Sequence, residues 1–144
     1  MYQNILIPTD GSEGVEKAVE QGLSLAEAYD ATVHALYVIE PVYSADYGTN
    51  QIIDALQAEG ERATEAIEEQ SEQRGISATT AVRTGAPHRQ ILDYVDENDV
   101  DLVVMGTHGR TGIGRYLLGS VTEKVVRLSD VPVLTVSMQS PDEE

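Results

Sequence analysis

A glycine-rich stretch, Gly106 to Thr122, carries the residues best suited to bind phosphate. Five glycines stand within fourteen residues, at positions 106, 109, 112, 114 and 119. Glycine allows positive φ and close approach of the backbone to a ligand, and amides exposed in such turns form anion-binding concavities. We predict that a helix from Gly119 to Leu128 follows, whose first amides and dipole favour phosphate, with added hydroxyl donors from Ser120 and Thr122.

The charge of the same stretch also favours an anion. From Leu102 through Thr122 there is no acidic residue, whereas His108, Arg110 and Arg115 are present. The stretch is not a Walker A loop because it has no lysine, and it is not a dinucleotide fingerprint because that motif follows the first strand. A flexible surface loop would also explain the glycines, but their agreement with the charge and the following helix favours phosphate binding.

The elements that must position this stretch alternate between strands and helices. Short apolar or β-branched runs predict strands at Ile5 to Pro8, Ala31 to Ile39, Ile76 to Arg83, Leu102 to Met105 and Val131 to Val136. Helical spacing predicts four helices, over Val15 to Ala26, Asn50 to Arg74, Pro87 to Glu97 and Gly119 to Leu128. Ser12 is expected to cap the first helix, and Gly75 to end the second. In the last helix we expect Val121, Val125 and Leu128 to be buried.

This order predicts an α/β fold, with a parallel sheet covered by helices on both faces. The more polar strand at residues 76 to 83 is expected at an edge. Ligands of such sheets bind at the carboxyl ends of the strands, where the winding direction reverses. We therefore expect the site in the loops after the first, second and fourth strands, which contain Asp10, residues 38 to 40, and Gly106 onward.

Size and charge limit the classes of function. We expect the 144 residues to form one domain over residues 1–139 and a frayed acidic tail over 140–144. There is no cysteine, no signal peptide and no apolar run long enough to span a membrane, which suggests the cytoplasm. The net charge of −16 disfavours nucleic acid and anionic membranes as partners. It is typical of a halophile, although an ordinary acidic protein would also gain solubility from it.

The spacing Gly106-x2-Gly109-x9-Gly119-Ser120 resembles the ATP-binding signature of universal stress proteins. The resemblance covers nearly the whole chain and includes Ile5 to Ser12, Gly85 to Pro87, Asp101 to Gly106 and Val131 to Leu134. It implies a Rossmann-like, five-stranded parallel sheet in the order 3-2-1-4-5, similar to that of adenine nucleotide alpha hydrolases. It also implies ATP across strands one and four, and a homodimer through the last strand, Val131 to Val136.

The resemblance further implies which residues line the site. Asp10 would lie near the ribose or a phosphate-bound Mg²⁺, although it could also cap the first helix through other atoms. Val38 would meet adenine through its backbone. The remaining residues would border the nucleotide after the first strand (Pro8, Thr9), line the ribose (Met105, Gly106), or hold phosphates (His108, Gly109, Arg110, Gly119, Ser120, Val121, Thr122).

The residues favour holding ATP, or AMP or ADP, over cleaving it. Hydrolysis needs an oriented water and usually a base, and Asp10 is the one acid that we place near the phosphates. We therefore expect a nucleotide-dependent regulatory dimer of the stress response, with no catalytic residues assigned. The alternatives are a slow ATPase, a switch that phosphorylates itself on Ser120 or Thr122, and a nucleotide-free dimer that acts through protein partners.

Overall fold

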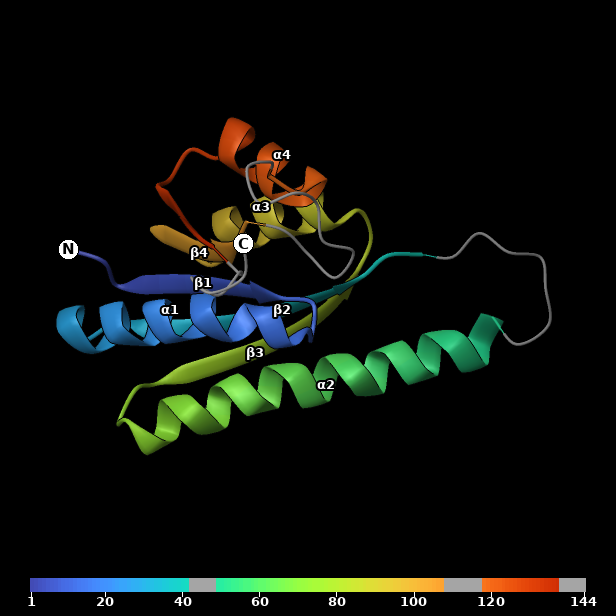
Figure 1. The fold of residues 1–144 in the computed structure, drawn as a ribbon, viewed down its shortest axis with the longest axis horizontal. Coiled ribbons are helices and arrows are strands. Elements are labelled where there is room, and N and C mark those ends of the chain that lie inside the picture. The colour runs from blue at the N-terminus through green and yellow to red at the C-terminus, as the bar shows by residue number, and fades with distance from the viewer. Residues whose placement is uncertain (42–48, 108–117, 138–144) are drawn as a thin grey trace, which may run out of the picture.

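Strands and helices alternate along the chain as the sequence predicts (Figure 1). The structure, a computed structural model, describes residues 1–41, 49–107 and 118–137. Its elements are β1 (Asn4–Thr9), the short 3₁₀ helix η1 (Glu13–Val15), α1 (Glu16–Tyr29), β2 (Thr32–Ile39), α2 (Thr49–Gln73), β3 (Ala78–Thr84), α3 (Pro87–Glu97), β4 (Leu102–Gly106), α4 (Ser120–Leu128) and β5 (Val133–Val136).

The five strands form one sheet in the order β3-β2-β1-β4-β5, and every pairing is parallel. This confirms the predicted fold class and the position of β3 at an edge. The chain builds outward from β1 to β3, then returns to the other side of β1 to place β4 and β5. The winding direction therefore reverses between β1 and β4, where a ligand site is expected in this class of fold.

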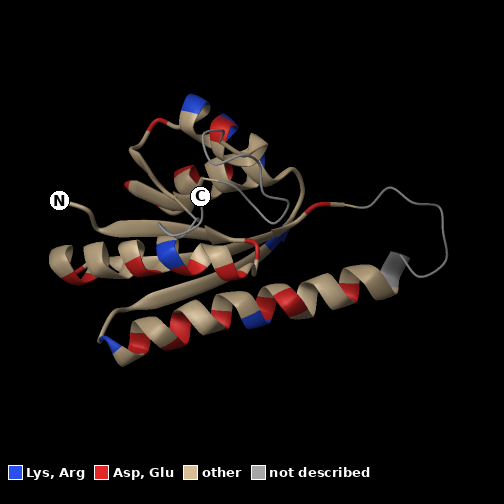
Figure 2. Ribbon diagram, in the orientation of Figure 1, with Lys and Arg blue, Asp and Glu red and all other residues tan. Residues whose placement is uncertain are grey.

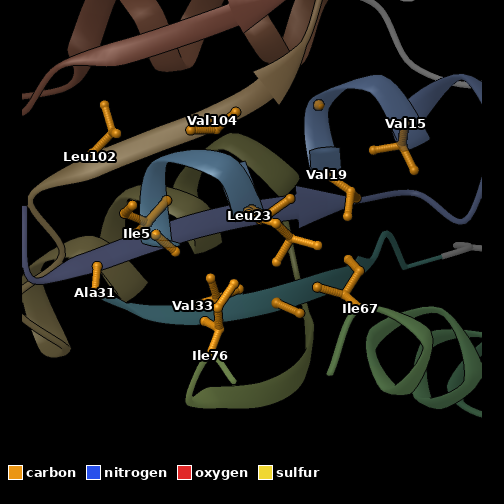
Figure 3. Packing of buried hydrophobic residues seen from close by; sticks show 14 residues of the cluster. Ile5, Val15, Val19, Leu23, Ala31, Val33, Ile67, Ile76, Leu102 and Val104 are labelled. Carbon is orange, nitrogen blue, oxygen red and sulfur yellow. The ribbon is translucent and has the colours of Figure 1, made fainter. Parts of the chain in front are cut away.

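Alternate residues of each central strand face two separate hydrophobic cores. Ile5, Ile7, Val33 and Val104 pack with residues of α1 and with Ile67 of α2 (Figure 3). Leu6, Leu36, Val103 and Met105 pack on the opposite face with Ile91, Tyr94 and Val95 of α3 and Val125 of α4. The strands are buried on both sides because each face of a parallel sheet is covered by crossover helices.

The sequence correctly predicts the end of α2 at Gly75. Gly75 has φ of +73°, its N–H donates to the carbonyl of Glu72, and the N–H of Ile76 donates to the carbonyl of Ser71. These bonds form a Schellman motif, in which glycine takes the left-handed position after the helix. The N–H of Ile76 is engaged in this motif, and the third strand begins at Ala78 rather than at the predicted Ile76.

Two predictions at the end of the chain are wrong in detail. Leu128 is 49% exposed, not buried, whereas Val125 is fully buried. α4 ends at Leu128 and packs on α3 and on β5, a four-residue edge strand that leaves this last turn uncovered. The last strand begins at Val133 rather than Val131, after Pro132, which has no amide hydrogen for a sheet.

Among the described residues, no helix combines the length and the apolar character that a membrane span needs.

Candidate functional site

The carboxyl ends of β1 and β4 lie beside each other at the switch point of the sheet. The β1–β2 ladder continues through Pro8↔Leu36 to Thr9↔Tyr37, whereas the β1–β4 ladder consists of Ile5↔Leu102 and Leu6↔Val103. It stops before Pro8, a residue without an amide hydrogen. The last residues of β1 and β4 are therefore not paired with each other. The loops that follow the two strands begin at these unpaired ends.

In the turn after β1, two backbone amides donate hydrogen bonds to side chains of the same turn. The N–H of Gly11 donates to Thr9 Oγ1 at 3.0 Å, and the N–H of Ser12 donates to Asp10 Oδ1 at 2.9 Å. Gly11 has φ of +79°, which the turn requires. Asp10 thus holds the turn ahead of η1, one step before the helix that it was expected to cap. Ser12, predicted to cap the helix over Val15 to Ala26, instead precedes η1 and its side chain makes no capping bond, while Val15 is at the N-cap position of α1.

The start of α4 is attached to the end of β4 by two hydrogen bonds. The N–H of Gly119 donates to the carbonyl of Thr107 at 2.7 Å. Thr122 Oγ1 donates to the carbonyl of Gly106 at 2.8 Å, and Thr122 is 3% exposed. The next amides, those of Ser120, Val121 and Thr122, lie in the first turn of α4 and so have no intrahelical carbonyl to bind. Three amide donors are thereby held close to the carboxyl end of β4.

These bonds revise what the sequence predicts for Thr122. Its hydroxyl proton is used inside the protein by the Gly106 carbonyl, so it is not an added donor for phosphate. The Thr122 side chain instead positions the first turn of α4. The backbone amide of Thr122 is the group that has no acceptor within the helix. Ser120 is exposed at the first position of the helix, and its phosphate contact stays a prediction.

The remaining predicted residues contribute mainly backbone. Met105 is buried in the core under α3 and α4, and Gly106 is buried at the end of β4. Val38 is half-buried, packs against the same core, and pairs with Arg83 of β3. Beyond it the carbonyl of Ile39 accepts the N–H of Gly85. His108, Gly109 and Arg110, which the sequence places at the phosphates, lie outside the described residues, as does Arg115.

Acidic residues are most numerous along α2 (Figure 2), whereas Asp10 stands in the turn after β1. The described residues of β4 and of the first three positions of α4 contain no acid. The next residue, Glu123, is exposed and forms an ion pair with Arg127 one turn along, at 2.9 Å. The positive end of the α4 dipole therefore lies near the end of β4, and the carboxylate that follows it in sequence is already paired.

His34 has a structural environment, as the sequence predicts. Its Nδ1 lies 2.6 Å from the hydroxyl of Tyr94, and its Nε2 lies 3.0 Å from Asn4 Oδ1. Because an amide oxygen can only accept, Nε2 carries the proton and Nδ1 accepts from Tyr94. Burial lowers the pKa of His34, since the protein interior disfavours the charged ring. This histidine is near the amino ends of β1 and β2, at the opposite end of the sheet from the site.

Sequence reasoning did not single out Ser12 as a site residue. The Oγ of Ser12 is buried and makes no hydrogen bond in the structure. Ser12 stands in the run Thr9-Asp10-Gly11-Ser12 directly after β1. This position after the first strand could have indicated a site residue. Serine is also a frequent N-cap residue, and that interpretation was preferred.

Comparison with known proteins connects this architecture to one family. A profile of the Universal stress protein family matches residues 1–137. Universal stress protein MJ0531 of Methanocaldococcus jannaschii is 36% identical over 140 residues, which cover 94% of this chain and 82% of the relative. The solved structure of MJ0577, a protein of the same organism, was the subject of a structure-based assignment of biochemical function. It superposes with a TM-score of 0.87 and 33% identity, covering 97% of this chain and 99% of that one.

A second solved structure is a universal stress protein in complex with cAMP. It matches with a TM-score of 0.70 and 27% identity, and the match covers 96% of this chain and 98% of that one.

Proposed function

The chain belongs to the universal stress protein family, and on this basis we propose that it is an ATP-binding protein that acts as a nucleotide-dependent regulatory dimer in stress response. The observation that carries the nucleotide proposal is the junction of β4 and α4. There the bonds Gly119 to Thr107 and Thr122 to Gly106 hold the first amides of α4 at the switch point of the sheet. The relative in complex with cAMP supports an adenine nucleotide as the ligand.

The proposed binding mode follows from which groups are free to donate. The phosphates would accept from the amides of Ser120, Val121 and Thr122, assisted by the helix dipole. The ribose would lie between Gly106 and the turn at Asp10, and adenine would extend across β1 toward the backbone at Val38. The glycine-rich stretch that begins at Gly106 would complete the phosphate contacts.

A proline at position 120 tests the amide contacts directly. Proline fits the first position of a helix, and Gly119, with φ of −64° and ψ of 158°, already has the extended backbone that precedes proline. Ser120→Pro therefore removes one amide donor while α4 is retained, and Ser120→Ala is the matched control for loss of the hydroxyl. Because a hydrogen bond to a charged group contributes about 1.5–3 kcal/mol, we expect ATP affinity to fall roughly 10- to 100-fold more in Ser120→Pro than in the control.

Isothermal titration calorimetry measures this difference, and circular dichroism checks that both variants are folded. If folded Ser120→Pro bound ATP as tightly as Ser120→Ala, the phosphates would not use this amide and the proposed mode would be wrong. Mass spectrometry of the small molecule that co-purifies with the protein provides an independent test. Protein that carries no nucleotide and binds none at millimolar ATP would favour a dimer that acts only through protein partners.

The dimer proposal depends on the exposed edge of the sheet. β5 has one strand neighbour, β4, so its other edge can pair with a second copy. Leu134 on β5 is 37% exposed, and Val126 and Leu128 on the adjacent α4 are 43% and 49% exposed. Leu134→Lys should convert the dimer to a monomer by burying an unpaired charge, with sedimentation velocity as the measurement. An unchanged dimer would place the interface elsewhere.

A self-phosphorylating switch is the second candidate, and the exposure of Ser120 favours it. Of the two hydroxyls that the sequence offers as acceptors, Thr122 is buried and bonded to Gly106, whereas Ser120 is accessible at the phosphate end of α4. Incubation with γ-labelled ATP and Mg²⁺ should label wild type and leave Ser120→Ala unlabelled. Equal labelling of both proteins would exclude Ser120 as the acceptor.

A further inference from the structure

The turn between β1 and η1 follows the end of β1 at the switch point, and two of its amides are already engaged. The N–H groups of Gly11 and Ser12 are both used by side chains of the same turn, Thr9 Oγ1 and Asp10 Oδ1. A loop that binds phosphate needs its amides free, as in the first turn of α4. The turn after β1 is therefore less suited to an anion than the first turn of α4.

Within this turn the hydroxyl of Ser12 has no partner. Its N–H donates to Asp10 Oδ1 and its carbonyl accepts from the N–H of Val15 at 3.3 Å, so both backbone groups are engaged. The Oγ atom is buried and makes no hydrogen bond in the structure. Burying an unsatisfied hydroxyl costs about 1–3 kcal/mol, and such groups in folded proteins call for a specific reason.

The Asp10 carboxylate belongs to the same turn and accepts a hydrogen bond from the Ser12 amide. An ionised carboxylate accepts through both of its oxygens, and the bond from the Ser12 amide uses Oδ1. Serine hydroxyl and carboxylate oxygens are hard donors of the kind that Mg²⁺ takes together with phosphate oxygens and water. The described part of the chain contains no cluster of three or more histidine or acidic side chains that could bind a metal by itself. A cation here would thus depend on nucleotide phosphates for further ligands.

We propose that Ser12 Oγ, with the neighbouring Asp10 carboxylate, binds the divalent cation that accompanies the nucleotide phosphates. The inference rests on the proposed nucleotide binding and adds the protein's own contribution to the cation. The cation neutralises phosphate charge on the side of the site where Asp10 would otherwise repel it. The amides of α4 hold the phosphates from the other side, so the two halves of the site have complementary polarity.

The experiment measures ATP affinity by calorimetry with Mg²⁺ and again with EDTA. It compares wild type with Ser12→Ala, with Ser12→Thr, which keeps the hydroxyl, and with Ser24→Ala, which removes an exposed hydroxyl of α1 far from the turn. Threonine is compatible with the extended backbone of Ser12, φ −78° and ψ 158°. We expect Ser12→Ala to weaken ATP binding about tenfold with Mg²⁺ and to leave it unchanged in EDTA, and we expect both other variants to match wild type.

The other outcomes overturn the proposal in distinguishable ways. Equal weakening with Mg²⁺ and with EDTA would mean that Ser12 contacts the nucleotide itself, and no weakening in either would mean that it binds neither. Wild type that fails to bind ATP under both conditions would refute the proposed function, and this inference with it. Nucleotide-free Ser12→Ala should melt at or above the wild-type temperature, because it loses a buried unpaired group; melting well below wild type would show that the hydroxyl has a structural partner.

Discussion

Thr122→Val tests whether one buried hydroxyl positions the start of α4. Valine has nearly the shape of threonine but cannot donate, so the change removes the 2.8 Å bond to the Gly106 carbonyl without leaving a cavity. Thr122 is 3% exposed, and water therefore has no easy access to replace the lost donor. The perturbation is confined to one hydrogen bond between the end of β4 and the first turn of α4.

The expected loss of stability follows from that burial. Deleting one partner of a buried hydrogen bond costs about 1–3 kcal/mol, because the remaining acceptor is left desolvated. For a domain of about 150 residues, each kcal/mol lowers Tm by roughly 2–4 °C, so Thr122→Val should melt about 2–12 °C below wild type. ATP affinity should fall as well, because the amides of Ser120 and Val121 lose the bond that fixes them against β4.

Urea unfolding followed by circular dichroism measures the free energy, and an unchanged m-value shows that the folded and unfolded states are comparable. Thr122→Ser is the matched control. It keeps the hydroxyl and loses one methyl group, at a cost of about 0.8 kcal/mol. If Thr122→Val were as stable as wild type while Thr122→Ser was destabilised, the methyl and not the hydrogen bond would hold this junction, and the reasoning would be refuted.

Three further predictions concern the scaffold and the solvent. Burial lowers the pKa of His34 below its usual 6.5, so the unfolded chain binds more protons. The free energy of unfolding should therefore fall as the pH decreases below about 6.5, and His34→Gln should reduce that dependence in urea titrations at several pH values. A Cβ at Gly22 would lie 2.5 Å from Ile7 Cδ1, so Gly22→Ala should lower the free energy of unfolding by about 1–3 kcal/mol. An unchanged unfolding midpoint would contradict the close packing of Gly22 against Ile7. The net charge of −16 leads us to propose a halophilic protein, whose melting temperature should rise from low salt to molar KCl; a flat salt profile would rule that out.

Local patterns in the sequence were sufficient for the element order. The alternation of apolar runs with helical spacing predicts the strands and helices, because burial on one face of a helix, or on both faces of a central strand, imposes a period that is visible in the residues themselves. The stop of α2 at Gly75 is local for the same reason, since a Schellman motif involves only neighbouring residues. The prediction that Leu128 is buried was wrong. Its burial depends on which elements cover the last turn of the helix, and the spacing of apolar residues within the helix does not contain that information.

The properties of the site that decide its chemistry depend on contacts between segments far apart in the chain. The order of the sheet places β1 beside β4, so the turn after β1 and the start of α4, about 110 residues later, follow neighbouring strands at the switch point. Whether Thr122 donates to a ligand or to Gly106, and whether the amides of Gly11 and Ser12 are free or consumed, is settled by hydrogen-bond partners in the folded chain.

The sequence by itself determined the strand–helix alternation and the glycine-rich stretch suited to phosphate, because both depend on residue type and spacing. Only the tertiary structure decided which polar atoms near the switch point are engaged and which, like Ser12 Oγ, have no hydrogen-bond partner among the described residues. The physical reason is that the spacing of hydrophobic residues is a property of neighbouring positions in the chain. The partner of each hydrogen bond, in contrast, depends on which segments folding brings together.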